Sequence, residues 1–397
     1  MIRAGNRLTL LDSAAYFPAL LQALDAATEE IHLESYLFRA DHTGQAVVDA
    51  LARAAQRGVT VRVLLDGFGA RDLPRRVRDH FDAAGVQWQM FRPVWLHWRA
   101  RQQRMRRMHR KLVLVDARLG YIGGINVLDN LEDGRLPALR HDYMVEVAGP
   151  VIADMHASAR RLWQRVCWSR LGRAGAIRRD AAWRPPDVAP AGTQRAEFVE
   201  RDTLRRRRAI EARYLQAIHH ARHEIVIANA YFLPGVRFRH ALMQAARRGV
   251  RVVLMVQGYT DHPLYRAATR ALYGYFLENG VEIYEYEASE LHAKVAVVDA
   301  RWATVGSSNI DPFSLLLARE ANLFVHDAPF AETLLASLED AMRAGARPIH
   351  RMNWRRRSRG RRVLAWLAYG WVRALMGLAG VALGWDRPRG KRDAGRR

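Results

Sequence analysis

Two copies of one pattern contain the residues of this chain that are best suited to chemistry. In each copy a histidine is followed two residues later by a lysine and five residues after that by an aspartate: His109, Lys111 and Asp116, then His292, Lys294 and Asp299. The chain has only three lysines among its 63 basic residues, and two of them lie in these copies. A compact ammonium is not equivalent to the planar guanidinium of Arg. The pattern therefore predicts a site for a small anion with strict geometry.

Each copy continues into an apolar run and then into a turn of small residues. The run is rich in β-branched side chains, which predicts a strand buried on both faces, and a period of two places His and Lys on one side of it. The turns are Gly123-Gly124 and Gly306-Ser307, which allow backbone N–H groups to approach an anion. The two half-sites are chemically unequal, because only the second has a hydroxyl here, from Ser307.

Two further pairs complete the predicted phosphate site. Asn126 and Asn309 follow the turns and can add amide donors to the phosphate oxygens. Asp116 and Asp299 belong to the repeated pattern but lie an odd number of residues past each histidine. They therefore fall on the opposite face of the strand, where we expect them to support the structure rather than to react.

The elements around the two copies are repeated as well. Residues 30–38 parallel 224–232, and the period of a little under two hundred residues indicates a duplicated domain rather than a solenoid. Strands alternate with amphipathic helices such as 44–56 and 238–248, each followed by a capping glycine. This alternation predicts α/β domains with a largely parallel sheet. We divide the chain into a first domain, a linker, a second domain and a tail: 1–170, 171–200, 201–350 and 351–397.

The paired pattern and its surroundings resemble the signature of the phospholipase D superfamily, in particular the bacterial cardiolipin synthases of the B type. The resemblance covers about residues 5–350 and includes the segments 107–111, 123–126, 230–234 and 306–311. It implies two duplicated phospholipase D-like α/β domains in a bilobal body with pseudo-two-fold symmetry. It also implies a phosphatidyltransferase that makes cardiolipin from phosphatidylglycerol and a second phospholipid.

Two imidazoles that face one phosphate can perform this reaction by covalent catalysis. One attacks phosphorus to give a phosphohistidine, and the other protonates the leaving alkoxide and then activates the incoming hydroxyl. The resemblance implies that His109 is the nucleophile and His292 the acid and base, although the near symmetry leaves the reverse assignment open. It also implies that Asp142 and Glu320, shortly downstream of each motif, hold the second nitrogen of an imidazole.

We expect neither a metal nor another cofactor. His32, Glu34, Asp66 and His141 could suggest a metal site, but no His and carboxylate spacing repeats between the halves. Two alternatives to a transferase remain at this stage. One is a hydrolase of the same superfamily, either a phospholipase D or a nuclease, and the other is a binding protein with a vestigial site.

Composition indicates an anionic partner. The net charge is +23, and a single cysteine excludes a disulfide framework. Residues 363–385 are apolar apart from Arg373 and lie between basic segments, which favours a helix in the membrane interface over a spanning helix or a core helix. A basic-aromatic stretch, 95–108, also suits lipid head groups. We expect a cell-membrane protein, peripheral or tail-anchored, with its catalytic body on the cytoplasmic side, and we do not expect nucleic acid as a partner.

Overall fold

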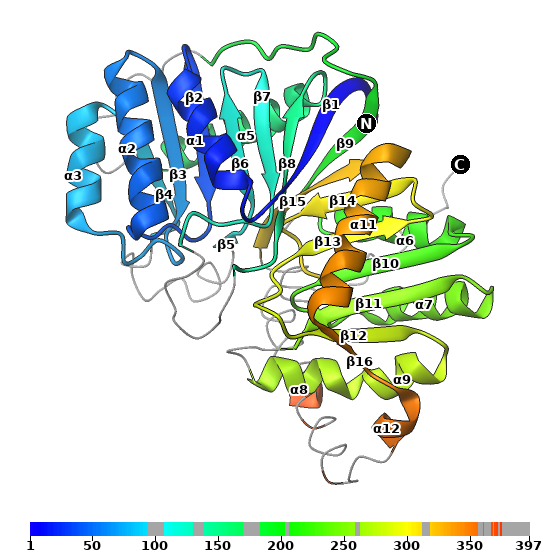
Figure 1. Cartoon of the computed structure of the whole chain (residues 1–397). Coiled ribbons are helices and arrows are strands. Elements are labelled where there is room, and N and C mark those ends of the chain that lie inside the picture. Colours follow the sequence, from blue (N-terminus) through cyan, green and yellow to red (C-terminus); the bar gives the residue numbers. More distant parts are fainter. Residues whose placement is uncertain are drawn as a thin grey trace, which may run out of the picture.

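The computed structural model describes residues 1–93, 107–129, 139–169, 183–202, 206–258, 263–311 and 318–355, with a few residues between 360 and 374. Both halves of the chain contribute strands to a single sheet in a mixed α/β fold (Figure 1). Most of the basic-aromatic stretch 95–108 lies outside the described residues. So does most of the tail, and the expectation of a membrane-associated helix therefore stays a prediction.

The elements of the two halves follow each other in nearly the same order. The first half contains β1 (Arg3–Asp12), α1 (Tyr16–Ala26), β2 (Glu30–Ser35), α2 (His42–Gln56), β3 (Thr60–Asp66), α3 (Arg75–Ala84), β4 (Gln87–Phe91), β5 (Arg107–Met108), β6 (Lys111–Val115), β7 (Leu119–Gly123), β8 (Tyr143–Ala148) and α5 (Ile152–Trp168). The second half contains β9 (Gln194–Arg201), α6 (Ala209–His220), β10 (Glu224–Asn229), α7 (Val236–Arg247), β11 (Arg251–Gln257), α8 (Pro263–Ala271), α9 (Tyr273–Glu278), β12 (Glu282–Tyr286), β13 (Lys294–Val298), β14 (Trp302–Gly306), β15 (Ala318–Val325), α11 (Ala328–Gly345), β16 (Ala346–Pro348) and α12 (Arg351–Arg355).

The strand order repeats on both sides of a central junction. β1 and β9 pair antiparallel and join the halves. From this junction outward the first half runs β1-β8-β7-β6-β2-β3-β4, and the second runs β9-β15-β14-β13-β10-β11-β12-β16. Each strand of the first sequence thus has its counterpart at the same place in the second. The duplication predicted from the sequence is present in the topology.

The sheet is mixed, so the prediction of a largely parallel sheet is wrong. β2, β3 and β4 run parallel, as do β10, β11 and β12, but β6, β7 and β8 are antiparallel, as are β13, β14 and β15. The reason is the turn after each motif lysine strand. Asp116 and Ala117 have φ of 52° and 51°, and Asp299 and Ala300 have φ of 50° and 48°. Such short turns produce antiparallel hairpins, whereas parallel strands require a crossover.

The predicted helices are present, with starts two residues earlier than expected. Asp41 begins α2 by accepting a hydrogen bond from the Gly44 N–H at 2.8 Å. Gly58 and Gly249 follow α2 and α7 with φ of 92° and 88°, which confirms them as capping glycines. Amphipathic periodicity identified both helices, and the cap residues extend them beyond the apolar positions.

Helices cover both faces of the sheet, and one apolar core spans the junction. α1 and α2 bury Leu20, Leu24, Val47 and Leu51 on one face of the first half. α6 and α7 do the same on one face of the second half. A further cluster joins side chains of β6, β8 and α5 with side chains of β13, β14 and α11, and α11 crosses the second half in Figure 1. The two halves therefore share a core.

The segments at the predicted domain boundaries contact the folded body. Residues 194–200, which we included in the linker, form most of β9. Trp354 in α12 stacks on Tyr273 of α9 at 5.1 Å between ring centroids, and Tyr369 accepts a hydrogen bond from Arg239 of α7 at 3.1 Å. The beginning of the tail therefore lies against the second half. Within the residues that the structure describes, no helix is long and apolar enough to cross a membrane.

Candidate active site

The segments that carry the two histidines each pair with the opposite half of the chain. The His109 N–H donates to the Arg319 carbonyl at 2.9 Å, and the His292 N–H donates to the His141 carbonyl at 2.8 Å. Arg319 belongs to β15, and His141 lies just before β8. These two contacts are equivalent under the duplication. They place both histidines at the junction of the halves.

Each imidazole is held by a carboxylate from the other half. His109 Nδ1 lies 3.2 Å from Glu320 Oε2, and His292 Nδ1 lies 2.5 Å from Asp142 Oδ2. Asp142 and Glu320 are the acids predicted from the sequence, but each binds the histidine of the opposite half rather than that of its own. This exchange orients the Nε2 atom of each ring away from its carboxylate. Neither half therefore contains a complete half-site.

Burial controls the charge of these four groups. It lowers the pKa of His109 and, together with the nearby Lys294, lowers the pKa of His292 well below its usual value. Burial also raises the pKa of Asp142 to about 6. Burial would raise the pKa of Glu320 too, but the nearby His109 and Arg201 hold it below its usual range. Both imidazoles are therefore neutral near pH 7, and a neutral ring can act as a nucleophile.

The two lysines are fixed in the same way in both halves. Lys111 Nζ donates to the His109 carbonyl at 2.7 Å, and Lys294 Nζ donates to the His292 carbonyl. The side chains are almost fully buried, and this burial lowers the pKa of Lys111 to about 7 and that of Lys294 to about 8. His109 and His292 lie just before β6 and β13, which begin at the lysines, so the same-side placement expected from the period of a strand stays a prediction. The ammonium groups lie beside the imidazoles, where they can neutralise an anionic phosphate.

The turns after β7 and β14 differ in how they contact the carboxylates. Ser307 Oγ donates to Glu320 Oε2 at 2.5 Å. A Cβ atom at Gly124 would lie 2.3 Å from Asp142 Oδ1, so a side chain does not fit there. The shorter Asp is thus matched with Gly and the longer Glu with Ser. The sequence predicted that the two half-sites are chemically unequal. They differ in the carboxylate that holds each histidine and in the turn residue that contacts this carboxylate.

Asn126 and Asn309 are buried in the segments after these turns. Asn126 Oδ1 accepts a hydrogen bond from the Leu37 N–H at 3.1 Å, which fixes the orientation of the amide. In the second half Asn229 accepts from the Ile310 N–H at the same distance. The phosphate contacts that we expect of Asn126 and Asn309 stay a prediction.

The two aspartates of the pattern lie at the far end of the strands. Asp116 accepts hydrogen bonds from the backbone N–H groups of residues 28–30, and Asp299 accepts from those of residues 222–224. Both occupy a left-handed turn position, which Asp tolerates better than most residues. We infer that they fix the hairpin to the start of β2 or β10 and do not touch the substrate.

Sequence reasoning missed several residues that position the site. Asp66 accepts from the Met108 N–H at 2.8 Å, and Gln257 accepts from the Leu291 N–H at 2.7 Å. Both end a parallel strand at the edge where sites form in α/β sheets, a position that could have identified them.

The residues that could have suggested a metal site have other partners. His32 and Glu34 bind each other at 2.8 Å, and Glu34 pairs with Arg110. In the part of the chain that the structure describes, no cluster of three or more potential metal ligands occurs.

Comparison with known proteins agrees with this paired geometry. A family model described as "Cardiolipin synthase, PLD-like domain" matches residues 20–163 and 214–342. The chain belongs to the cardiolipin synthases of the phospholipase D superfamily. The two matched segments of this cardiolipin synthase lie one in each half, so the family domain occurs twice.

Individual relatives extend this assignment over most of the chain. The cardiolipin synthase resembles cardiolipin synthase B of Escherichia coli strain K12, with 39% identity over 358 residues that cover 87% of this chain and 83% of that protein. It is 31% identical to the major cardiolipin synthase ClsA of Bacillus subtilis over 337 residues, 83% of this chain and 67% of the relative. Its fold is similar to that of phosphatidylserine synthase from Haemophilus influenzae, with a TM-score of 0.65, 15% identity and 94% of each chain covered.

Proposed function

We propose that this cardiolipin synthase transfers a phosphatidyl group from phosphatidylglycerol to a second phospholipid through a phosphohistidine intermediate. The exchange of carboxylates between the halves is the observation that carries this proposal. It turns the Nε2 atom of each ring away from its carboxylate, and His109, Lys111 and Lys294 lie near enough to His292 to lower its pKa. The donor phosphate occupies the space between the two rings.

In the first step His109 Nε2 attacks phosphorus as the bond to the leaving alcohol breaks. A proton on His292 Nε2 passes to the leaving oxygen. Binding of the anionic phosphate raises the pKa of His292, which is low in the free protein, and so supplies this proton. Lys111, Lys294, Asn126 and Asn309 hold the non-bridging oxygens.

In the second step the acceptor hydroxyl attacks the phosphohistidine. His292 Nε2 takes the hydroxyl proton as the new P–O bond forms and the P–N bond to His109 breaks. Asp142 keeps His292 in the required orientation, and Glu320 does the same for His109. If a glycerol hydroxyl of phosphatidylglycerol is the acceptor, the product is cardiolipin.

Mass spectrometry of lipids after incubation with phosphatidylglycerol vesicles tests this reaction. We expect cardiolipin and free glycerol as products, without an added cofactor. Rapid acid quenching of the wild-type protein with donor lipid should trap a phosphatidyl group on His109, and His109→Ala should trap none. Phosphatidic acid as the main product would identify a hydrolase and contradict the proposal.

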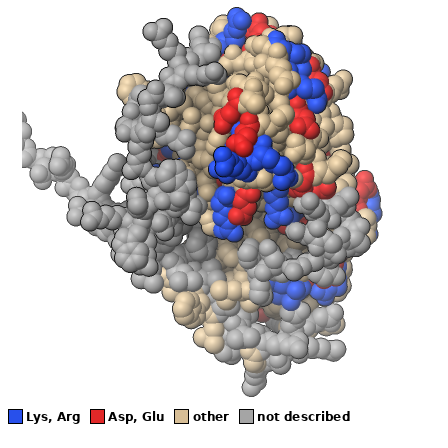
Figure 2. Space-filling model, turned by 90° about the vertical axis from the view of Figure 1, so that its left-hand side faces the viewer, with Lys and Arg blue, Asp and Glu red and all other residues tan. Residues whose placement is uncertain are grey.

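We also propose that the tail holds the enzyme on the anionic, cytoplasmic surface of the cell membrane. Residues 351–397 contain fourteen basic and two acidic residues, so they supply more than half of the net charge. By contrast, the face that carries α2 and α3 shows basic and acidic side chains side by side (Figure 2), with ion pairs such as Arg53–Asp25 at 2.8 Å and Arg75–Asp79 at 3.6 Å. Basic residues near an anionic leaflet contribute about 1 kcal/mol each.

Deletion of residues 375–397 tests the tail without removing Trp354 or Tyr369, which contact the body. We expect weaker sedimentation with anionic vesicles and lower activity on them, while cleavage of a short-chain soluble phosphodiester stays unchanged. Equal sedimentation of the full-length and shortened proteins would contradict this role.

A further inference from the structure

The carboxylate that holds His109 lies opposite an arginine. Glu320 of β15 is the direct partner of Arg201 in the antiparallel pair of β15 and β9. Directly opposite residues of such a pair direct their side chains to the same face of the sheet. Glu320 is 0% exposed and Arg201 is 1% exposed. The carboxylate and the guanidinium therefore lie on one side of the sheet and away from water, where charges act strongly on each other.

In the first half a serine takes the place of this arginine. The strand registers make Ser13 the counterpart of Arg201, because each follows the residue that pairs with the neighbour of the carboxylate. The hydrogen bonds agree with this correspondence. Ser13 Oγ donates to the Arg140 carbonyl at 2.5 Å, and Arg201 Nη2 donates to the Ala318 carbonyl at 2.6 Å, each two residues before its carboxylate. The two side chains thus make the same backbone contact, but only Arg201 adds a charge.

The contact with Ala318 uses only part of the Arg201 guanidinium. The Nε and Nη1 atoms are buried and have no hydrogen-bond partner among the described residues. Burial lowers the pKa of Arg201 to about 10, so the side chain stays charged at neutral pH. Of the carboxylates near it, Glu320 acts on it most strongly, ahead of Asp311 and Asp202.

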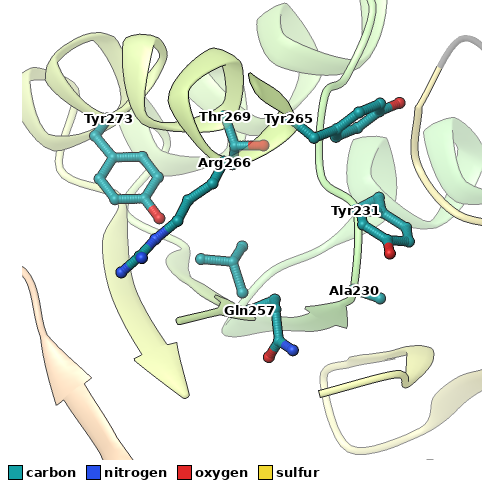
Figure 3. A pocket seen from close by; sticks show the side chains of 8 residues that line it. Ala230, Tyr231, Gln257, Tyr265, Arg266, Thr269 and Tyr273 are labelled. Atoms are coloured by element: carbon teal, nitrogen blue, oxygen red, sulfur yellow. The ribbon is translucent and has the colours of Figure 1, made fainter. Parts of the chain in front are cut away.

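The second of these carboxylates, Asp311, has a partner on a neighbouring helix. It accepts a hydrogen bond from Tyr265 of α8, and the Tyr265 ring packs edge-on against Tyr231 at 5.2 Å between ring centroids. Both tyrosines line a hollow between α8 and the strand ends (Figure 3). Glu320 is therefore the main counter-charge of Arg201.

Arg201 is also the charge that distinguishes Glu320 from Asp142. Besides the two histidines, the titratable groups of the described residues that act on one or both carboxylates are Tyr36, Lys111, Arg140, Tyr143, Arg201 and Lys294. The two lysines act on both carboxylates, and the tyrosines are neutral because burial raises their pKa. Arg140 lies near Asp142, but its Nη2 atom donates to Glu290 at 2.6 Å, which offsets its charge.

The two carboxylates consequently differ in how readily they take up a proton. Burial raises the pKa of Asp142 to about 6. Burial acts on Glu320 in the same direction, but His109 and Arg201 hold the pKa of Glu320 below its usual range. As pH falls, Asp142 is therefore protonated well before Glu320.

We propose that Arg201, acting through Glu320, makes His109 rather than His292 the nucleophile. An ionised Glu320 accepts the Nδ1–H of His109 and leaves a lone pair on Nε2, which is the form that attacks phosphorus. The pair of Asp142 and His292 retains a proton more readily and can supply it to the leaving alcohol. Arg201 is thus a positioning residue. The inference rests on the proposed phosphohistidine reaction and explains how a nearly symmetrical site acquires two roles.

Trapping of the covalent intermediate tests this assignment. After rapid quenching of the protein with phosphatidylglycerol vesicles, peptide mass spectrometry measures the ratio of phosphatidyl groups on His109 to those on His292. We expect the wild-type adduct on His109. Arg201→Gln keeps an amide donor for the Ala318 carbonyl but lacks the charge, and it should lower the ratio about tenfold, as a change of one pKa unit in Glu320 would. Arg201→Lys keeps the charge and should retain most of the ratio.

The pH dependence of kcat/KM gives a readout that a merely structural role would not move. Glu320 must be ionised, so activity is lost as pH falls through its pKa. Arg201→Gln raises that pKa and should move the acid limb upward by about one pH unit, whereas Arg201→Lys should leave it in place. If Arg201 only filled space, the two variants would behave alike and the limb would not move.

Two further variants keep the test independent of a single substitution. Glu320→Gln removes the carboxylate charge itself and should lower the adduct ratio at least as much as Arg201→Gln does. Arg195→Gln, an exposed position on the same strand, is the matched control and should change neither the ratio nor the acid limb. A wild-type adduct on His292, or an unchanged ratio and acid limb in Arg201→Gln, would overturn the inference. Absence of both a histidine adduct and cardiolipin with the wild-type protein would instead overturn the proposed function.

Discussion

The two halves of the molecule differ most on the sheet face that α5 covers in the first half and α11 in the second. In the first half this face buries His32, Glu34, Arg62 and Arg110. In the second half the corresponding positions are Val226, Ala228, Val253 and Ala293, which belong to an apolar core. The strand registers agree with this correspondence, because His32 is the partner of Arg62 and Val226 is the partner of Val253. The duplication preserved the strands but not the chemistry of this interior.

The buried charges of the first half form a connected network around the catalytic strand. Arg110 lies between His109 and Lys111, and it donates to Glu34 at 2.8 Å and to Ser158 of α5 at 2.6 Å. Trp183 from the segment between the halves stacks on Arg62 at 4.5 Å. Removing charges from water is costly, so such a network stabilises less than an apolar core of the same size. We infer that the network places the segment of His109 specifically, at a cost in the stability of the first half.

The largest effects should come from the features that the halves share. His109→Ala and His292→Ala should each reduce transfer at least about 10³-fold, and the double variant should be hardly worse than either single variant. Both rings act on one phosphorus, so loss of one makes the other ineffective. Steady-state cardiolipin formation on vesicles measures this. Substantial turnover in either single variant would show that the halves act independently.

The next largest effect should be on stability. Removing one charged partner from the buried network of the first half should lower the free energy of unfolding more than a substitution on the apolar face of the second half. Glu34→Ala removes the nearest carboxylate from the buried guanidinium of Arg110 and leaves it with Ser158 and the more distant Glu200, so the cost should approach about 3 kcal/mol. Adding Arg110→Ala should recover part of this loss, because Ala228 and Ala293 show that alanines are accepted at the corresponding places. Denaturant unfolding of the single and double variants measures the difference. A double variant as unstable as the sum of the two single variants would contradict the proposed coupling.

The buried lysines should limit activity at high pH. Burial lowers the pKa of Lys111 to about 7 and that of Lys294 to about 8, so the ammonium charges are present below these values and are lost as pH rises through them. We expect kcat/KM to begin to fall near pH 7, where Lys111 loses its charge, and to fall more steeply above about pH 8, where Lys294 does. Lys111→Arg should reduce kcat/KM by about 10- to 100-fold, since Arg lacks the required shape, but should move the alkaline decline upward. A pH profile of Lys111→Arg identical to that of the wild-type protein would contradict this interpretation.

The smallest effect should come from the turn residues that distinguish the halves. Ser307→Gly removes one hydrogen bond to Glu320 and should cost about 0.5–1.5 kcal/mol, with transfer reduced less than about tenfold. Gly124→Ser should be more harmful, because its Cβ would approach the Asp142 carboxylate too closely. Thermal unfolding and transfer rates of both variants compare them. Equal tolerance of the two changes would mean that the half-sites are interchangeable here.

Local features of this protein were determined by the sequence alone. The strands that follow His109 and His292, the capping glycines and the duplication all depend on short spacing or on repetition. The period of a strand is two whatever the strand packs against, so a pattern of a few residues is enough to predict it. Asp116 and Asp299 lie just past the ends of β6 and β13 in left-handed turns, where the period of a strand no longer applies.

Only the tertiary structure decided which carboxylate serves which histidine. Asp142 and His292 are 150 residues apart, and Glu320 and His109 are 211 apart, so no local spacing contains the pairing. The shared core depends equally on how β1 meets β9. Contacts of this kind arise from packing of distant segments, and a single sequence records the residues but not their partners.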